Sequence, residues 1–195
     1  MIGILDYGMG NLRSVQKAFE YLGAKTLITS DTGALNGCSR LILPGVGSFA
    51  EGMKNLSRAG LDSYVFERSA DTPILGICLG MQFLLSESEE EGITQGLNFV
   101  KGRVTRFTEG KIPHMGWNGV FSLKTPLFEG IPEGTPFYFV HSYFAETDDE
   151  FIASKTEYHR TYASAVHAGN VYGVQFHPEK SGEAGLALLR NFMRL

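Results

Sequence analysis

The stretch Thr72-Pro-Ile-Leu-Gly-Ile-Cys-Leu-Gly-Met-Gln82 decides the fold of this chain. Its first half is a short apolar run that is typical of a buried strand, and Gly80 marks a sharp turn into a helix. A buried strand that leads into a helix is the repeating unit of a parallel sheet. Sites in open parallel sheets form beyond the carboxyl ends of the strands, and Cys78 falls at such an end.

The residues around this stretch alternate between apolar strands and amphipathic helices. The expected strands of the first half are Ile2–Leu5, Lys25–Thr29, Arg40–Leu43 and Ile74–Ile77. The expected helices run from Leu12 to Leu22, from Phe49 to about Arg68 with a break at Gly60, and over Met81–Leu85. Consecutive strands joined by helices predict an α/β fold, with an open, mainly parallel sheet and helices on both faces.

The pattern changes after Ser86, where the acidic run Ser86–Glu91 is interpreted as a solvated loop or a frayed helix end. Short β-rich segments follow and are interpreted as antiparallel or edge strands added to the parallel core. These segments are Val100–Phe107, Gly119–Leu123, Phe137–Val140, Phe151–Lys155 and Tyr162–His167. A last strand, Val171–Phe176, and a closing helix, Gly185–Leu195, complete a single domain over residues 1–195.

The composition narrows the class of protein. Of the 195 residues, 43% are hydrophobic and 19% are charged, which indicates one globular domain. The net charge of −4 offers no electrostatic surface for nucleic acid or for an anionic membrane. Cys38 and Cys78 do not make a disulfide framework, and no signal peptide or membrane span is recognisable. We therefore expect a cytoplasmic protein without nucleic-acid or membrane partners.

His177-Pro-Glu179 follows the last strand and supplies a possible base with its own carboxylate. A thiol at a helix N-terminus near an imidazole is favoured in its thiolate form. A carboxylate two residues from a histidine can hold its tautomer and stabilise the imidazolium. Cys78, His177 and Glu179 are therefore the predicted nucleophile, base and orienting acid of an enzyme that attacks a carbonyl.

Two other kinds of site are less well supported by the residues. A tetrahedral metal site needs a second close-spaced Cys/His pair, which the chain lacks, so we expect no metal. Gly8-Met-Gly10 begins like a dinucleotide fingerprint, but Arg13 stands where the third glycine belongs. We therefore expect no NAD and no other cofactor.

Three motifs, in this order, resemble those of the class I (triad) glutamine amidotransferases: Pro44-Gly-Val-Gly47, Gly76-Ile-Cys-Leu-Gly-Met-Gln82 and His177-Pro-Glu179. Two further segments, Asp6-Tyr-Gly-Met-Gly-Asn-Leu-Arg-Ser-Val15 and Pro113-His-Met-Gly-Trp-Asn118, resemble the glutaminase subunit of imidazole glycerol phosphate synthases, from histidine biosynthesis. The likeness covers essentially the whole chain and implies the flavodoxin-like fold of that class. The triad motifs specify only the superfamily, whereas the Pro113–Asn118 segment specifies the subfamily.

The resemblance implies that Cys78 attacks the side-chain amide of L-glutamine, that His177 moves the proton, and that Glu179 orients His177. Ammonia leaves, and water then hydrolyses the γ-glutamyl thioester. The backbone N–H groups of Val46 and Leu79 are the expected oxyanion hole. The residues expected to hold glutamine are Gly47, Gln82, Ser142 and Tyr143. His141 is expected to shape the strand beside them.

In that family, a synthase subunit of (βα)₈-barrel type consumes the ammonia and makes imidazole glycerol phosphate and an aminoimidazole carboxamide ribotide. This chain is too short for such a barrel, so the resemblance implies a heterodimer with a separate chain. The residues expected at the interface are Asn11, Trp117, Asn118 and Lys180, with core packing as the alternative for Trp117. The flexible Gly-Val-Gly segment predicts that the isolated chain is a poor glutaminase until the partner and its ligand activate it.

The sequence leaves two alternatives open. One is a glutaminase that serves another class I synthase, such as a pyridoxal phosphate, anthranilate or nucleotide synthase, although Pro113–Asn118 argues against it. The other is a free Cys-His-Glu hydrolase or a catalytically silent binding subunit. A free hydrolase would work without a partner, and a silent subunit would ignore an alkylating glutamine analogue.

Overall fold

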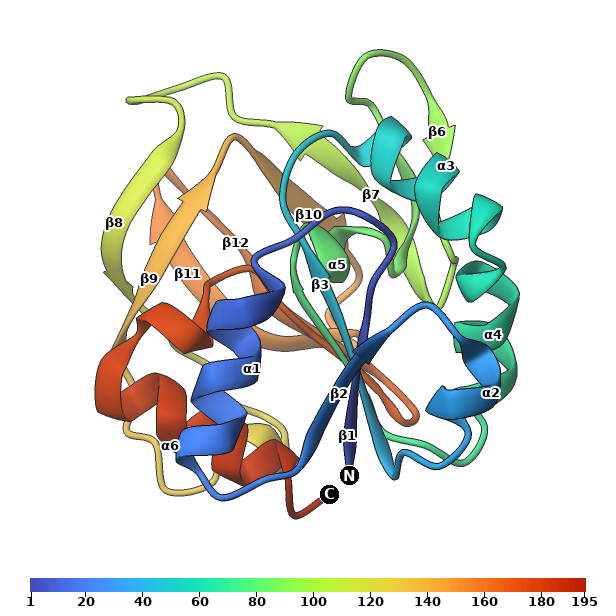
Figure 1. The fold of residues 1–195 in the computed structure, drawn as a ribbon. Helices are drawn as coiled ribbons and strands as arrows, with labels where there is room; N and C mark the ends of the chain where they lie inside the picture. Colours follow the sequence, from blue (N-terminus) through green and yellow to red (C-terminus); the bar gives the residue numbers. More distant parts are fainter.

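The computed structural model describes all residues from Met1 to Leu195, and Figure 1 shows how the elements are arranged. The strands are β1 Ile2–Leu5, β2 Thr26–Thr29, β3 Arg40–Gly45, β4 Ile74–Cys78, β5 Leu85–Ser88, β6 Thr94–Gln95, β7 Val100–Arg106, β8 His114–Gly119, β9 Pro136–His141, β10 Tyr143–Thr147, β11 Ile152–Tyr158, β12 Arg160–Ala168 and β13 Val171–Val174. The helices are α1 Leu12–Tyr21, α2 Thr32–Leu35, α3 Phe49–Arg58, α4 Leu61–Arg68, α5 Leu79–Gln82 and α6 Gly182–Phe192, with the 3₁₀ helices η1 Pro126–Phe128 and η2 Pro178–Lys180.

One long sheet organises the fold, with the strand order β2-β1-β3-β4-β13-β12-β10-β7-β5-β6. The first five strands in this order are mutually parallel, and antiparallel pairing begins between β13 and β12. β11 pairs with β12 off this path, and β8 and β9 form a separate antiparallel pair. The predicted α/β fold, a mixed sheet with a parallel core and added antiparallel strands, is confirmed.

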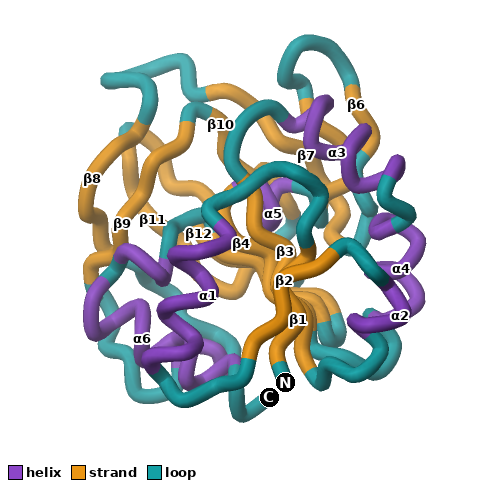
Figure 2. Tube along the Cα trace, in the orientation of Figure 1, coloured by secondary structure: helices purple, strands orange, loops and turns teal.

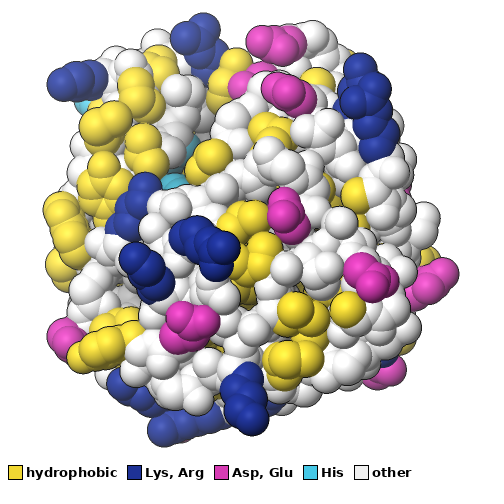
Figure 3. All heavy atoms as spheres, viewed as in Figure 1, with side chains coloured by type: hydrophobic (Ala, Val, Ile, Leu, Met, Phe, Trp, Pro, Cys, Tyr) yellow, Lys and Arg dark blue, Asp and Glu magenta, His cyan; other side chains and the backbone are white.

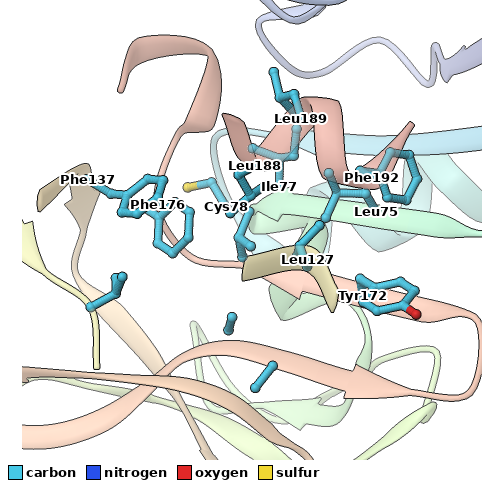
Figure 4. Close-up of a cluster of buried hydrophobic side chains, with 14 of the residues drawn as sticks. Leu75, Ile77, Cys78, Leu127, Phe137, Tyr172, Phe176, Leu188, Leu189 and Phe192 are labelled. Atoms are coloured by element: carbon cyan, nitrogen blue, oxygen red, sulfur yellow. The ribbon is translucent and has the colours of Figure 1, made fainter. Parts of the chain in front are cut away.

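Helices cover both faces of the parallel core, as Figures 1 and 2 show. α1 and α6 lie on one face, and α3 and α4 lie on the other. The side chains of β4 alternate accordingly, because successive residues of a strand point to opposite faces. Leu75 and Ile77 pack with Leu188 and Phe192 of α6 in the cluster of Figure 4, whereas Ile74 joins the core under α3 and α4.

The chain needs glycine where α5 packs against the ends of β3 and β4. A Cβ on Gly80 would lie 1.8 Å from the carbonyl oxygen of Leu43, and one on Gly76 would lie 2.6 Å from the carbonyl oxygen of Gly80. No side chain fits at such distances, so backbone meets backbone directly. Because of this close approach, the turn at Cys78 lies directly against the edge of the sheet.

The prediction of a helix over Met81–Leu85 is wrong in its extent. α5 ends at Gln82, and Leu85 instead begins β5, which pairs with β7 in the long sheet. The acidic segment Ser86–Glu91 is therefore partly a strand, and Ser88 is fully buried. Sheet pairing and burial at Leu85 and Ser88 outweigh the helical propensity of the local sequence.

The strand expected over Gly119–Leu123 is also wrong. The strand in this region is β8, which ends at Gly119, and Phe121 makes only an isolated bridge with Lys155. β8 escapes a search for alternating apolar residues because its polarity is inverted: His114 faces inward while Met115 is exposed. The structure also adds β10, which the sequence pattern did not indicate, and places the closing helix over Gly182–Phe192 rather than Gly185–Leu195.

Candidate active site

Cys78 stands on a strained turn between β4 and α5. It pairs with Gly45 of β3 across the sheet and has a positive φ of 56°. Such a conformation costs a residue with a side chain about 1–3 kcal/mol and is concentrated at functional sites. Cys78 is 7% exposed, and the helix behind it extends over only four residues. Because one helical turn aligns few peptide dipoles, neighbouring side chains contribute more than the helix to the environment of the thiol.

His177 and Glu179 lie at the same edge of the sheet as Cys78 because β13 is the parallel neighbour of β4. The two strands pair in register up to Val174 and Ile77, so the chain leaves both at one edge. The 3₁₀ helix η2 then turns Glu179 back towards the imidazole, and His177 Nδ1 lies 2.8 Å from Glu179 Oε1. The two side chains are only 3% and 1% exposed.

The charge of His177 depends on a balance between burial and two neighbours. Burial lowers the pKa of the imidazole, but Cys78 and Glu179 both stabilise the protonated ring and together raise its pKa to about 10. Nδ1 faces Glu179, whereas Nε2 has no hydrogen-bond partner. Nε2 is therefore the atom that can exchange a proton with the thiol or with a bound molecule. The arrangement suits a thiolate–imidazolium pair, which is the reactive form of a cysteine nucleophile.

A pocket of about 420 Å³ is lined by Cys78 and His177, and it is large enough for an amino acid. Its wall includes eight more residues that were singled out from the sequence: Val46, Gly47, Leu79, Gln82, His141, Ser142, Tyr143 and Lys180. Gln82 is fixed in this wall because its Nε2 donates a hydrogen bond to the carbonyl of Tyr143 at 3.1 Å. The fold thus brings together residues from β4, α5, β9 and β10 and from the segments that follow β3 and β13.

The Pro44-Gly-Val-Gly47 segment forms one wall of the pocket and is held at both ends. The hydroxyl of Tyr7 donates a hydrogen bond to the carbonyl of its first residue. Met9 packs on Gly47, where an added Cβ would lie 2.7 Å from the methionine Cε, and Gly47 itself has a φ of +106°. Val46 between these anchors is 41% exposed. A segment with fixed ends, an exposed centre and a glycine hinge can reorient its central peptide.

The other residues predicted for the partner interface lie outside this pocket. Trp117 is 57% exposed on β8, so the alternative that it packs in the core is wrong. Its ring meets Tyr138 edge to face with the ring centroids 6.1 Å apart, and Lys180 Nζ lies 5.9 Å from the centre of the same tyrosine ring. Asn118 Nδ2 donates a hydrogen bond to a backbone carbonyl of β11. Asn11 precedes α1 and lines a separate hollow.

The strand that carries Tyr138 is tied directly to the histidine of the site. The backbone N–H of His177 donates to the carbonyl of Tyr138 at 2.9 Å, and the N–H of Tyr138 donates to Ser181 Oγ at 3.0 Å. Ser181 in turn donates to the carbonyl of His177 at 2.7 Å. A displacement of the β8–β9 hairpin, on which Trp117 is exposed, therefore acts on the backbone that positions the imidazole.

Two polar residues of the site were not predicted from the sequence. Glu90 lines the pocket, and its Oε2 accepts a hydrogen bond from the N–H of Phe49 at 2.7 Å, although its acidic segment was interpreted as solvated. Gln175 is fully buried with its Nε2 only 3.7 Å from Cys78 Sγ. The sequence does contain a signal for Gln175. Residues two apart on a strand share a face, and His177 lies two residues after Gln175, so both side chains are expected on the same side. No local pattern marks Glu90, whose contact depends on the tertiary fold.

A pair of buried histidines, His114 and His141, supports the pocket wall, and His141 is itself part of the lining. His141 Nδ1 donates to the carbonyl of Tyr143 at 2.8 Å, so its Nε2 accepts from His114 Nδ1 at 3.0 Å. Burial lowers the pKa of His141 to about 3 and that of His114 to about 4, so both rings are neutral. The carbonyl of Tyr143 also accepts the hydrogen bond from Gln82, so the pair positions a wall residue of the pocket rather than reacting itself.

No group of three or more histidine, cysteine, aspartate or glutamate side chains is placed to hold a metal ion. None of the helices has the length and the apolar character needed to cross a lipid bilayer. Both cysteines are free thiols, and of the two only Cys78 lines the pocket.

A strained cysteine turn, a buried histidine–carboxylate pair and a small-molecule pocket together define a cysteine-dependent hydrolase or transferase site. The chain belongs to the family described as glutamine amidotransferase class-I, whose family model matches residues 3–195. The membership predicted from the motifs is therefore confirmed.

Within this family, the chain is similar over its full length to subunits of imidazole glycerol phosphate synthase. It is 50% identical to the imidazole glycerol phosphate synthase subunit HisH of Methanocaldococcus jannaschii, with 100% of both chains covered. The subunit HisH of Moorella thermoacetica is also 50% identical, over 100% of this chain and 94% of the relative. That of Archaeoglobus fulgidus is 46% identical, over 100% of this chain and 98% of the relative.

Solved structures support the fold. A crystal structure of a glutamine amidotransferase matches with a TM-score of 0.78 and 21% identity, covering 99% of this chain and 97% of that one. The structure of PurLQS from Thermotoga maritima matches with a TM-score of 0.77 and 19% identity, with the same coverage. At these identities the likeness establishes the architecture alone, and it agrees with the family.

Proposed function

We propose that this chain is the glutaminase subunit of imidazole glycerol phosphate synthase in histidine biosynthesis. It hydrolyses L-glutamine and passes the ammonia to a separate cyclase subunit, which makes imidazole glycerol phosphate and an aminoimidazole carboxamide ribotide. The observation that carries the proposal is the buried His177–Glu179 pair next to Cys78. His177 and Cys78 line the same pocket, which is large enough for glutamine. Full-length similarity to HisH subunits favours this synthase over other class I members. Residues 1–195 act as one glutaminase domain around a continuous sheet.

The first half of the reaction makes a thioester. Cys78 Sγ attacks the side-chain amide carbon of glutamine, and the carbonyl oxygen becomes an oxyanion. The backbone N–H groups of Val46 and Leu79 are assigned to this oxyanion because both residues line the pocket with Cys78. His177 gives the thiol proton from Nε2 to the leaving nitrogen, the C–N bond breaks, and ammonia departs.

The second half returns the free enzyme. Water attacks the thioester carbon while His177 Nε2 takes a proton from it, the C–S bond breaks, and glutamate leaves. The sulfur departs as a thiolate beside the newly protonated imidazole. Glu179 keeps Nδ1 of His177 occupied throughout, so that only Nε2 exchanges protons.

Charge and hydrogen bonding in the pocket suit the polar end of glutamine. Glu90 is the one acidic side chain in the lining, and its carboxylate suits the α-ammonium group of an amino acid. Gln82 has its Nε2 engaged within the chain, so its Oε1 remains as the acceptor for a bound molecule. The remaining contacts are assigned to Gly47, Ser142 and Tyr143, which line the same pocket.

An exposed row of large apolar side chains supports a protein partner. Met115 and Trp117 occupy alternate positions of β8, Phe121 follows the strand, and the three side chains are 61%, 57% and 46% exposed. Figure 3 shows hydrophobic side chains gathered along the edge where Figure 1 places β8. An exposed apolar row with an aromatic anchor is typical of a protein interface. We assign this surface to a heterodimer with a cyclase subunit of (βα)₈-barrel type, with the interface residues Asn11, Trp117, Asn118 and Lys180.

The isolated chain is proposed to be a poor glutaminase that its partner activates. The exposed Val46 peptide and the hydrogen bonds from Tyr138 to the His177 segment provide two routes by which docking can complete the site. A reducing cytoplasm suits this chemistry, because Cys78 has to remain a free thiol.

Glutamate release from glutamine tests the proposal, with the wild-type chain alone and then mixed with the cyclase subunit and its nucleotide ligand. We expect little release alone, a large increase in the mixture, and none from Cys78→Ala, which keeps ammonia-dependent synthesis in the complex. Cys38→Ala is the matched control, since Cys38 is the other buried free cysteine. Equal activity with and without the partner would indicate a free hydrolase, and no release in any mixture would overturn the catalytic assignment.

A further inference from the structure

Gln175 is a fully buried polar residue that takes no part in the proposed steps of glutamine hydrolysis. It follows β13, and its backbone N–H donates to the carbonyl of Ser164 on β12 at 2.9 Å, which fixes the start of its side chain. The side chain lies between two residues of the pocket. Its Oε1 is 3.0 Å from Gln82 Nε2, and its Nε2 is 3.7 Å from Cys78 Sγ.

The hydrogen-bond network determines which way both carboxamides point. The carbonyl of Tyr143 can only accept, so the atom of Gln82 that faces it must be the donor Nε2. The other hydrogen of the same Nε2 then requires an acceptor on Gln175, which has to be Oε1. Gln175 consequently presents its NH₂ group to the sulfur of Cys78, to which an amide can only donate.

We propose that Gln175 is a positioning residue of the glutaminase reaction, an inference that rests on the proposed function of Cys78. Its Nε2 donates a hydrogen bond to the sulfur and favours the thiolate, both before attack and when the sulfur leaves the thioester. Its Oε1 holds the carboxamide of Gln82 so that the free oxygen of Gln82 serves the bound glutamine. One neutral side chain thereby couples the nucleophile to the substrate-binding wall.

Glutamine is the side chain that the geometry requires at this position. A glutamate carboxylate would accept from Gln82 but would place a negative charge beside the thiolate. A methionine would fill a similar volume, but it cannot donate to the sulfur and accepts only weakly. Asparagine is one methylene shorter and cannot span Gln82 and Cys78 from the same backbone position. The contact is buried, so water is not available to replace it.

The test compares Gln175→Met with Gln82→Met and with the double variant, each in complex with the cyclase subunit. We expect Gln175→Met to slow alkylation of Cys78 by iodoacetamide by roughly 10-fold, since it removes a hydrogen bond to a charged group. Gln82→Met should slow alkylation less than Gln175→Met does, because the donor to the sulfur is kept and only the hydrogen bond that orients it is lost. Both variants should raise KM for glutamine, and KM of the double variant should not exceed the larger single effect. If Gln175 had only a structural role, its replacement would not change the alkylation rate of Cys78 and KM for glutamine to different extents from the replacement of Gln82.

A folded Gln175→Met variant that is alkylated at the wild-type rate and keeps kcat and KM would overturn the inference. If Gln175→Met does not fold, the side-chain amide resonances of Gln175 in the wild-type chain decide the matter. They should shift when Cys78 is replaced by alanine, and unchanged resonances would contradict the contact. Failure of the proposed function is distinguishable, because then the wild-type complex itself would release no Cys78-dependent glutamate.

Discussion

His177 Nδ1 lies 2.8 Å from Glu179 Oε1, and the two side chains are only 3% and 1% exposed. The second oxygen of the Glu179 carboxylate, Oε2, has no hydrogen-bond partner in the chain. The carboxylate therefore directs its charge at the imidazole alone, and water cannot take its place. The tautomer of His177 depends on this contact, and the charge of the ring depends on it together with Cys78.

Glu179→Gln tests that dependence. An amide of the same shape can accept from Nδ1 but lacks the negative charge that stabilises the imidazolium, so the pKa of His177 falls below its raised value of about 10. We expect kcat of the glutaminase reaction to fall by roughly 100-fold or more, with the alkaline limb of the pH profile moved to lower pH. Glu183→Gln is the matched control on the exposed side of α6. An unchanged profile for Glu179→Gln would remove Glu179 from the site.

Glu90→Gln separates substrate binding from chemistry. The amide keeps an oxygen that can accept from the N–H of Phe49, but it lacks the charge that suits an ammonium group. We expect KM for glutamine to rise by roughly 10-fold or more with kcat little changed, because the lost hydrogen bond is charge-assisted. Steady-state kinetics of the complex measure both constants. Glu91→Gln, an exposed neighbour, should leave them unchanged, and equal effects from the two variants would show a general charge effect.

The turn that carries Cys78 should tolerate no side chain at Gly80. The alanine Cβ would lie 1.8 Å from the carbonyl oxygen of Leu43, and both groups belong to the backbone of packed elements. Gly80→Ala is expected to lower the free energy of unfolding by at least ~3 kcal/mol. At Gly37 the same change brings Cβ only to 3.6 Å from the nearest carbonyl, so Gly37→Ala should stay within ~0.5 kcal/mol. Urea unfolding followed by circular dichroism gives both values.

The parallel half of the fold and the reacting residues could be predicted because their signals are local. The apolar run that ends at Cys78 and the histidine and carboxylate of His177-Pro-Glu179 are each contained in a few neighbouring residues. Parallel pairing then brings the ends of β4 and β13 to one edge without further information. Short-range pattern and sheet geometry together were enough for this part of the site.

The remainder depends on contacts between distant segments. β8 turns apolar side chains outward and His114 inward, so its pattern misleads any search for a buried face. Leu85 becomes a strand only because β7 offers it a partner. Glu90 reaches the pocket through the N-terminus of α3, and the amide orientation of Gln175 follows from a network of three residues. None of these arrangements is contained in a local pattern.

The buried pair His114 and His141 should make the chain sensitive to acid. Their folded pKa values, about 4 and about 3, lie below the ordinary value of 6.5, so the unfolded chain binds protons first as pH falls. Stability is therefore fully present above pH ~6.5 and is lost progressively as pH falls towards the folded pKa values. Each histidine should account for roughly 2 kcal/mol of that loss at pH 5.

His114→Phe removes one of these titrations and keeps a ring in the stack between Phe139 and Tyr158. We expect its free energy of unfolding to change less between pH 7.5 and pH 5 than that of the wild type, which urea titrations at the two pH values measure. His159→Asn is the control, because His159 is exposed and asparagine tolerates its positive φ. An equal acid sensitivity in all three proteins would show that other groups dominate.

Trp117→Ala tests the proposed partner surface. The ring is exposed in the apolar row of β8 and contacts Tyr138, whose backbone is bonded to the His177 segment. Loss of a central aromatic anchor should weaken binding of the cyclase subunit by roughly 30-fold, with the thermal stability of the isolated chain unchanged. Titration calorimetry measures Kd. Phe66→Ala is the matched control, since Phe66 is an equally exposed aromatic residue on α4, on the opposite side of the molecule in Figure 1. If the partner binds Trp117→Ala as tightly as the wild type while Phe66→Ala weakens it, the interface lies over α4 instead.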